Sequence, residues 1–479
     1  MKRALTFVAL IVAGCEVGPD YKPPPIATPP AFSELPATPA AGRAADEASL
    51  SQWWTRIDDP ELQSLIARAL ASNLDLKSAV SRIRQAREQA IIAGAKEWPQ
   101  LNANGTGVNL HANSSPLAAI AGGSGGQGQA PPSGPSNIKI YSVGIDATWE
   151  IDVFGGVRRG IEEAEANAEA ASWTMHDAEV SLTAEVANDY LALRTAEARM
   201  AIVRNELARQ QDALRLIAAR RRAGFVTELD VNQQETLSSN TAAQLPPLAA
   251  EARVMEHAIA VLVGEQPEAI AKELDGSATF PAVRDDLAAG LPSDLLRRRP
   301  DIRAAERKLA AATAGIGVAV ADLYPKFDLI GSASFVSNHL SNLISGNNFS
   351  TIGFGQITWP IFHAGQIRAN IRVNEEMTEQ AYLAYQSAVL KALQETEDAL
   401  TRYANEEQRL AALEMSVNSA QSSAAIAAAQ YRAGLVTYVN VLTAQSTLLS
   451  AEDQMAQSRE AAAQDLVSLY KALGGGWSG

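Results

Sequence analysis

The feature that most constrains the fold of this chain is an internal repeat. Residues 222–227 read Arg-Ala-Gly-Phe-Val-Thr, and residues 432–437, which lie 210 positions later, read Arg-Ala-Gly-Leu-Val-Thr. Trp149 and Trp359 share this offset, whereas the segment at 73–79 finds its match 226 positions later. A repeat of this size is one structural unit duplicated, so the function must be shared between two similar halves. Rings, tubes and pores are built in this way, and few enzymes are.

The N-terminus predicts an exported protein. Residues 1–3 are Met-Lys-Arg, residues 4–13 are apolar, and the only cysteine of the chain, Cys15, follows Ala13 and Gly14. The apolar run is too short to span a bilayer and is typical of a signal peptide. Small residues before this cysteine resemble a bacterial lipobox, which implies that residues 1–14 are removed and that Cys15 is lipidated; an ordinary signal peptide with an incidental cysteine is the alternative. With one cysteine, the mature chain cannot form an internal disulfide.

The following segment and the charge limit the function further. Residues 15–60 begin with a stretch rich in Pro, Ala and Thr, which predicts an extended tether from the lipid to the folded body. Glu16, rather than Asp, follows the cysteine, as in lipoproteins sorted to the outer membrane. The net charge of −14 argues against a general binder of nucleic acid, because such binding depends on basic patches.

One segment is a clear β-strand. Residues 141–153 alternate apolar and polar side chains without error, which predicts a strand with one face of each kind. Its length suits a transmembrane barrel strand with its apolar face toward lipid, although a soluble sandwich would alternate similarly. We expect a counterpart at residues 327–335, and a further strand at 352–361 whose pattern shifts near Gly355, where we expect a bulge.

Two long helices are expected after the strands. Residues 156–222 and 361–432 contain no proline, have few glycines, and are dominated by strong helix formers. A helix of about 65 residues extends on the order of 100 Å, so it must lie along neighbours as a coiled coil or as one stave of a helical barrel. A soluble coiled-coil rod is the alternative, but a rod would not carry long amphipathic hairpins.

These elements give a two-fold domain plan. We expect the first repeat over 61–265 and the second over 291–473, joined by a linker at 266–290 and followed by a tail at 474–479. Each repeat supplies one β-hairpin, so the chain has four strands. About eight strands are the minimum for a membrane barrel, and an open edge in lipid is prohibitively costly. The strand count therefore predicts an oligomer.

The sequence resembles the TolC-like outer-membrane efflux factors, in particular the lipidated branch of OprM and the NodT-type lipoproteins. The most specific stretch is 291–306 (Leu-Pro-Ser-Asp-Leu-Leu-Arg-Arg-Arg-Pro-Asp-Ile-Arg-Ala-Ala-Glu), continued by 316–325, and the lipobox and repeated turns agree. In the motif, we expect Ser293 to cap a helix. Arg297, Arg298 and Arg299 either pair across helices or form a solvated run before Pro300.

The resemblance implies an α+β membrane protein. Long helices would form an α-barrel, and four transmembrane strands per chain would close as a twelve-stranded barrel in a homotrimer. The protein would be lipid-anchored in the outer membrane and extend into the periplasm. It would be the exit duct of a tripartite efflux system for drugs or other small toxic compounds, with a periplasmic adaptor and an inner-membrane transporter of the proton-driven RND type as partners.

The repeated turns lie where long helices reverse. Capping residues at such positions explain a helix–turn–helix without any further role. In the resembling family the tips meet the adaptor, which implies these docking residues: Arg222, Gly224, Phe225, Val226, Thr227, Arg432, Gly434, Leu435, Val436 and Thr437.

The resemblance also points to a periplasmic gate just after the turns. Family members close this end with acidic residues, but the second repeat here has Asn440 and Thr443, and only the first keeps an acid, Asp230. A carboxylate ring would repel itself and attract cations, whereas an Asn/Thr ring would close through neutral hydrogen bonds.

Other functions find less support. Gly122 to Gly126 fit the pattern G-x-S-x-G, but a nucleophile elbow needs a strand before and a helix after, and this stretch lies in a Gly/Ser/Gln tract at 121–135 that we expect to be a loop. The five histidines have no metal-ligand spacing and there is no phosphate-binding loop, so we expect no enzyme, no cofactor and no metal. The remaining alternatives are a structural periplasmic lipoprotein without a pore, or a duct for type I protein secretion or metal-ion efflux.

Overall fold

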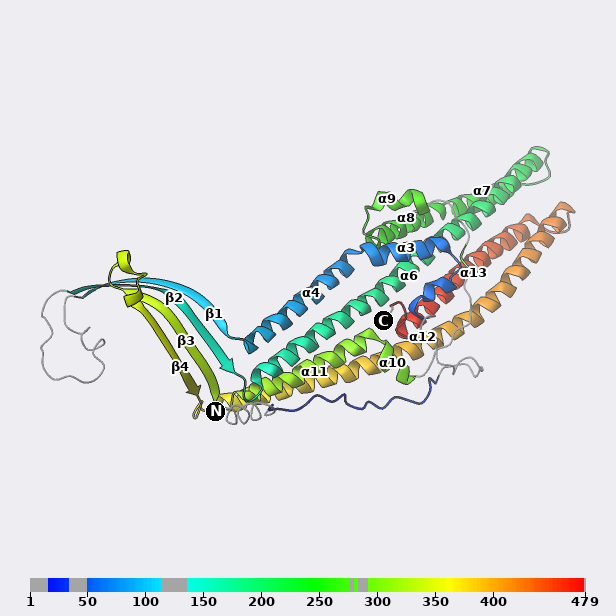
Figure 1. Cartoon of the computed structure of the whole chain (residues 1–479). Helices are drawn as coiled ribbons and strands as arrows, with labels where there is room; N and C mark the ends of the chain where they lie inside the picture. The colour runs from blue at the N-terminus through cyan, green and yellow to red at the C-terminus, as the bar shows by residue number, and fades with distance from the viewer. Residues whose placement is uncertain (1–15, 34–49, 113–135, 275–279, 283–291, 478–479) are drawn as a thin grey trace, which may run out of the picture. The chain divides into compact units, whose positions relative to one another are not determined.

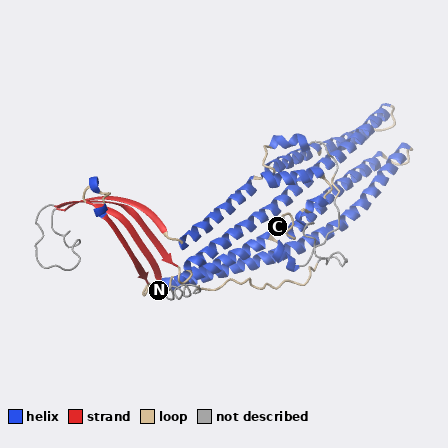
Figure 2. Ribbon diagram, in the orientation of Figure 1, coloured by secondary structure: helices blue, strands red, loops and turns tan. Residues whose placement is uncertain are grey.

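The computed structural model is mostly helical and contains one small antiparallel sheet (Figures 1 and 2). It describes residues 16–33, 50–112, 136–274, 280–282 and 292–477. Four of the sequence predictions lie wholly or mostly outside these residues: the signal peptide at 1–14, Cys15, the tract at 121–135 with its G-x-S-x-G pattern, and the linker.

Two compact units divide the chain. The first contains the sheet and the adjoining helix ends, from Gln85–Ala168 and Lys308–Ala381, together with the residues before Pro23. The second contains Glu169–Arg307, Tyr382–Gly479 and Pro23–Arg84. Long helices belong to both units. None of the described helices is long and apolar enough to cross a membrane.

The sheet of the first unit has four antiparallel strands in the order of the sequence. The strands form two hairpins, and a long helical connection from Gly156 to Ala321 separates the first hairpin from the second in the sequence. The strands are β1 (Gln100–Ala112), β2 (Ser136–Ile151), β3 (Lys326–Ser337) and β4 (Phe349–Thr358).

Three details of the strand prediction are wrong. β3 and β4 pair residue for residue from Lys326↔Thr358 to Phe335↔Phe349, so there is no bulge at Gly355, and β4 ends at Thr358. The pattern shifts because two apolar side chains of β4, Ile352 and Phe354, lie on the same face as the polar Gln356. β3 also pairs with β2 rather than repeating it: its equivalent is β1, which begins 226 residues earlier.

The two predicted long helices are present and have equal lengths. Helix α6 (Gly156–Arg222) and helix α12 (Gln366–Arg432) each contain 67 residues. Both the first and the last residue of α12 lie 210 positions after those of α6. Gly155 and Gly365 precede them with φ of +79° and +85°, a conformation that glycine adopts without strain. The repeat therefore includes the strand-to-helix turn.

The helices after the turns also correspond. In the second repeat, α13 (Tyr438–Ala472) is one helix of 35 residues. In the first repeat the same span is divided into α7 (Glu228–Ala242) and α8 (Leu245–Leu262). Pro246 and Pro247 explain the interruption, because proline cannot donate a helical hydrogen bond and is tolerated only in a first turn.

Upstream of the sheet, the equivalent helices follow the offset of 226. Helix α4 (Leu74–Gly94) corresponds to α11 (Pro300–Ala321), and each leads into the first strand of its hairpin. Shorter elements complete the fold: α3 (Pro60–Ser72), α9 (Pro267–Leu274), α10 (Pro292–Arg298), η1 (Trp53–Arg56), η2 (Ala95–Glu97), η3 (Leu340–Asn342) and η4 (Gly346–Asn348).

A buried polar network fixes α3 against α6 in the second unit. The Arg194 side chain is 1% exposed, forms ion pairs with Glu61 and with Glu197 at 2.5 Å, and lies over the Tyr190 ring. The Tyr190 hydroxyl donates to Asp59, the N-cap of α3, at 2.6 Å. Because a buried charge is tolerated only when it is paired, this network specifies how these helices pack.

One arginine of the arginine-rich motif, Arg299, pairs across helices as one of the two interpretations predicts, whereas Arg297 is exposed. Arg299, between α10 and α11, forms ion pairs with Asp301 and with Glu395 of α12, both at 2.7 Å, and donates to the Ala472 carbonyl of α13 at 3.1 Å. Ser293 is not an N-cap, because α10 already includes Pro292, whose fixed φ suits a first helical position.

Candidate functional site

One face of the sheet is suited to lipid. The odd-numbered positions of the four strands share this face, as the strand register shows. Among residues whose side chains are described, its only charge is Lys139, near the distal end of β2. Small residues lie in its centre and large apolar ones toward its ends, among them Tyr141, Trp149, Phe327, Leu329, Phe335, Phe349 and Ile357. An uncharged band with aromatic edges is what a membrane-facing strand surface requires.

The opposite face of the sheet is hydrated in character. Asp146 accepts hydrogen bonds from the side chains of Asn102 and Asn104, at 3.2 and 2.5 Å, and the hydroxyls of Thr106 and Ser142 lie 2.6 Å apart. Each of these bonds links β1 to β2. The even-numbered positions of the sheet therefore suit a water-filled lumen, although some of them carry apolar side chains: Val108, Ile140, Ile330, Val336, Ile352 and Phe354.

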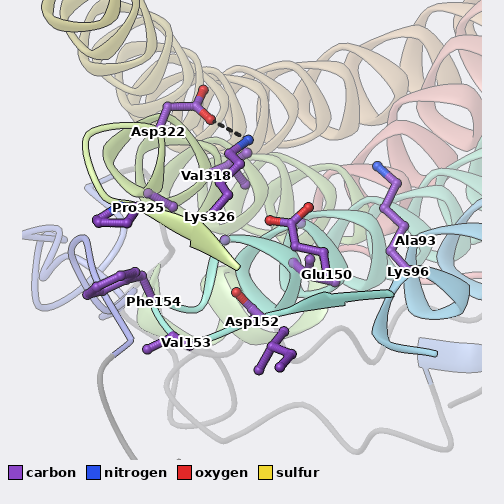
Figure 3. A pocket seen from close by; sticks show the side chains of 15 residues that line it. Ala93, Lys96, Glu150, Asp152, Val153, Phe154, Val318, Asp322, Pro325 and Lys326 are labelled. Carbon is purple, nitrogen blue, oxygen red and sulfur yellow. Dashed lines mark ion pairs between the residues drawn. The ribbon is translucent and has the colours of Figure 1, made fainter. Parts of the chain in front are cut away.

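A small pocket lies where the strands meet the helices of the first unit. Its volume is about 210 Å³, and Figure 3 shows its lining, which includes the Asp322–Lys326 ion pair at 3.0 Å. Lys96, Glu150 and Asp152 complete its charged groups. Charges of both signs surround this pocket, so it is not a concentrated phosphate or metal site. Among the residues described, no three His, Cys, Asp or Glu side chains gather as metal ligands would.

The first predicted tip is a tightly capped turn. After Arg222, Gly224 has φ of +80°, and the amides of Gly224 and Phe225 donate to the carbonyls of Arg221 and Arg220, both at 2.9 Å. This is a Schellman motif, which requires a left-handed residue and explains the glycine. The Phe225 side chain is 81% exposed, whereas Val226 is half-buried.

Asp230 closes the first tip through a capping box. Thr227 is the N-cap of α7, and its amide donates to the Asp230 carboxylate at 2.8 Å, while its hydroxyl accepts from the Asp230 amide at 3.4 Å. Reciprocal bonds of this kind satisfy two otherwise unpaired helix donors. The gate candidate of the first repeat therefore has a structural role of its own.

The second tip repeats the turn but not the capping box. Gly434 has φ of +76°, and the amides of Gly434 and Leu435 donate to the carbonyls of Tyr431 and Gln430 at 3.1 and 2.9 Å. Thr437 is the N-cap of α13 but makes no side-chain cap bond. The Leu435 side chain is 75% exposed, and Arg432 is also exposed.

The neutral gate candidates of the second repeat lie on the surface of α13. Asn440 is exposed, and its amide oxygen lies 3.4 Å from the Thr437 hydroxyl. Thr443 is also exposed, and its hydroxyl donates to the Val439 carbonyl of its own helix at 2.9 Å. Val436, between the turn and the helix, is half-buried as Val226 is.

The two tips pack against each other through a small core. Ile217, Val231, Tyr438 and Val441 are buried together, with Val226 at the edge. Within this core the Tyr438 hydroxyl donates to Gln234 Oε1 at 2.5 Å, and Gln234 Nε2 donates to the Gln210 carbonyl at 2.8 Å. A polar chain therefore links α13, α7 and α6 in the second unit. Sequence reasoning missed it, although a Tyr directly after the repeated turn was a visible signal.

The sheet and the repeated helical hairpins define a class of protein, the outer-membrane efflux channels. The profile described as "Outer membrane efflux protein" matches residues 65–265 and 291–475, and the chain belongs to this family. The family consists of transport proteins, so the protein is an outer-membrane efflux channel rather than a member of an enzyme family. The expected membership of this family, the fold of long helices with a small antiparallel sheet, and the outer-membrane location are confirmed.

The relatives cover nearly the whole chain. It is 34% identical over 476 residues to the pyoverdine export outer membrane protein OpmQ of Pseudomonas aeruginosa, covering 99% of this chain and 96% of that one. Identity to nodulation protein T of Rhizobium leguminosarum bv. viciae is 32% over 478 residues, with coverage of 100% and 94%. The solved outer-membrane channel OprN superposes with a TM-score of 0.87 at 34% identity, covering 97% of this chain and all of that one.

Proposed function

We propose that three copies of the chain close one twelve-stranded barrel in the outer membrane. The observation that carries this proposal is a four-stranded sheet with one mainly apolar face, whose only described charge is Lys139, and one mainly polar face. Its edges at β1 and β4 pair with nothing else in the described chain. In lipid, unpaired strand edges cost several kcal/mol per group, so β4 of one copy must pair with β1 of the next. Two copies would supply eight strands and three twelve; the resemblance to TolC-like channels supports three.

The assembly acts as the passive exit duct of a tripartite pump. The exposed tip residues, above all Phe225 and Leu435, contact a periplasmic adaptor, and an RND-type transporter supplies the energy. Cys15 carries a lipid that anchors the chain, and the cargo is a drug or other small toxic compound. The name of the pyoverdine export relative supports a small-molecule cargo.

The periplasmic end closes through neutral groups in the second repeat. Asn440 and Thr443 are exposed on α13, while the carboxylate of Asp230 is engaged in the capping box. We assign closure to hydrogen bonds between Asn440 and Thr443 of neighbouring copies, with the Tyr438–Gln234 bond holding the two tips of each copy together.

Reconstitution tests the duct directly. The protein purified in detergent should show the mass of a trimer by native mass spectrometry, and discrete conductance steps after insertion into planar bilayers. A monomer without conductance would refute the duct and favour the structural lipoprotein. In cells, deletion of the gene should sensitise the strain to small toxic compounds, and the intact chain should restore resistance.

A further inference from the structure

The first residues after Cys15 do not behave as a free tether. Glu16–Tyr21, which we call the strap, has no helix or strand, yet it lies against the first compact unit. The Val17 amide donates to the carbonyl of Phe154, in the turn between β2 and α6, at 3.1 Å. A segment whose backbone donates a hydrogen bond to another part of the chain is docked rather than loosely attached.

A buried arginine receives the strap. The Arg159 side chain, in the first turn of α6, is 4% exposed. Its Nη2 pairs with Asp20 at 2.6 Å, its Nε donates to the Val17 carbonyl at 3.3 Å, and Nη1 pairs with Glu162 at 2.6 Å. The strap supplies two of these three partners, so its docking completes the pairing of a buried guanidinium. Because the Asp20 carboxylate is 80% exposed, the ion pair contributes little to the free energy of docking, and the burial of the Arg159 side chain contributes more.

Glycines make the close approach possible. Gly18 has φ of +93°, and a Cβ added there would lie 2.5 Å from the Cα of Gly317 in α11. A Cβ at Gly317 would in turn lie 2.7 Å from Cγ of Arg159. The strap, α11 and the arginine are thus stacked with no room for a side chain between them.

An aromatic contact completes the docking. Tyr21 packs on a cluster of small residues, Ala166 of α6 with Ala310 and Ala311 of α11. Small residues here leave a shallow surface on which a ring can lie. The strap therefore has backbone, ionic and apolar contacts with the same helix pair.

We propose that the strap is an intramolecular ligand of the α6–α11 pair, with Arg159 as its positioning residue, so that a group attached to Cys15 is held at the strand-to-helix junction. The consequence of this docking rests on the proposed acylation of Cys15. A lipid on Cys15 would enter the membrane beside the base of the sheet instead of at the end of a flexible segment. The docking itself depends only on the strap and the two helices.

Hydrogen exchange of the full-length protein in detergent tests the docking. The peptide containing Val17 should be protected in the parent, and Gly18→Val, which cannot fit over Gly317, should raise its exchange rate at least about tenfold. Arg159→Met should do the same, and the exposed Lys22→Gln is the matched control that should change nothing. Exchange of the parent strap at the rate of a free peptide, or unchanged protection in both variants, would overturn the proposal.

A Cys15→Ala variant separates the strap from the lipid. Intact mass would show whether the parent carries acyl chains that this variant lacks, and that result alone decides the acylation. Strap protection should persist in Cys15→Ala, since the contacts of the strap are its own. Loss of protection together with the acyl group would mean that the lipid holds the strap, and the docking proposal would fail.

Discussion

The indole N–H of Trp149 donates a hydrogen bond to the carbonyl oxygen of Glu97 at 2.9 Å. Trp359 repeats this bond with Leu323 at 3.1 Å. The two tryptophans are 210 residues apart and the two carbonyls 226. The same hydrogen bond therefore connects a segment that repeats at an offset of 210 to one that repeats at an offset of 226. The 16 additional residues of the first repeat must therefore lie between Glu97 and Trp149, within the first hairpin.

Replacing either tryptophan should weaken the junction by a similar amount. Trp149→Phe and Trp359→Phe remove the N–H donor but keep a large apolar ring. We expect each to lower the free energy of unfolding by about 0.5–1 kcal/mol, since the sites are partly exposed and a net hydrogen bond contributes about that much. Urea unfolding in detergent checks this; a loss at only one tryptophan would contradict the equivalence of the two junctions.

The hydroxyl of Tyr438 should stabilise the pair of tips. Tyr438→Phe leaves Gln234 Oε1 buried without its donor, which costs about 1–2 kcal/mol. Tyr431→Phe is the matched control, because the Tyr431 hydroxyl is buried without a hydrogen-bond partner among the described residues. Thermal unfolding should separate the two variants, and bilayer recordings should show more frequent opening for Tyr438→Phe alone. Equal effects would argue against the bond as a link between the tips.

An acid at position 440 should change both stability and ion preference. Asn440→Asp would give α13 a partner for Thr437, as Asp230 is for Thr227, and should stabilise the second tip by about 0.5–1 kcal/mol. It would also place a carboxylate at the proposed gate and raise the cation-to-anion permeability ratio, measured as the reversal potential in a salt gradient. Glu414→Gln, an exposed change on α12, should leave that ratio unaltered.

Asp189 of α6 should make stability depend on pH. Burial, with a smaller contribution from Glu185, raises the pKa of its carboxyl from the ordinary 3.8 to about 6. The native state then holds this proton more tightly than the unfolded state, so ionisation of Asp189 destabilises the fold as the pH rises from about 4 to 6. Asp189→Asn should therefore be more stable than the parent by about 1 kcal/mol at pH 7.5, a value reduced for partial solvent exposure. At pH 4 the two unfolding midpoints should coincide, and an unchanged difference would contradict the assignment.

The exposed tip side chains should matter for export and not for folding. Phe225→Ser and Leu435→Ser remove apolar surface that the chain itself does not bury, so the unfolding free energy should change by less than about 0.5 kcal/mol. Resistance of cells to exported compounds should fall severalfold if the adaptor contacts these residues. Met415→Ser, at a side chain that is 67% exposed within α12, is the control. Full resistance in the double tip variant would remove these residues from the docking surface.

The sequence was sufficient to predict the long helices, because a long run of helix formers without proline leaves few alternatives. It was also sufficient to predict β2, whose apolar and polar side chains alternate strictly. It was weak for β1, where the apolar face is represented by Gly105, Gly107 and Ala103, whose side chains carry little hydropathic signal. It failed at β4, since Ile352 and Phe354 occupy the face that alternation assigns to polar residues.

The tips show a different limit. The glycines of the turns were predictable, because a left-handed cap needs glycine, and both have positive φ. The pairing of Tyr438 with Gln234, and of Arg159 with the strap, joins residues more than 130 positions apart. No local pattern encodes such contacts.

Helices α6 and α12 have the same number of residues, 67, between their first glycine-linked turn and their capped end. At 1.5 Å per residue, deleting one heptad from either helix would shift its tip by about 10 Å relative to the other. The equal lengths of the two helices therefore keep the two tips at the same distance from the strand-to-helix turns. Length changes should be tolerated only when both are shortened or extended together, so that the protein can evolve a longer or shorter reach only by changing both halves of its repeat at once.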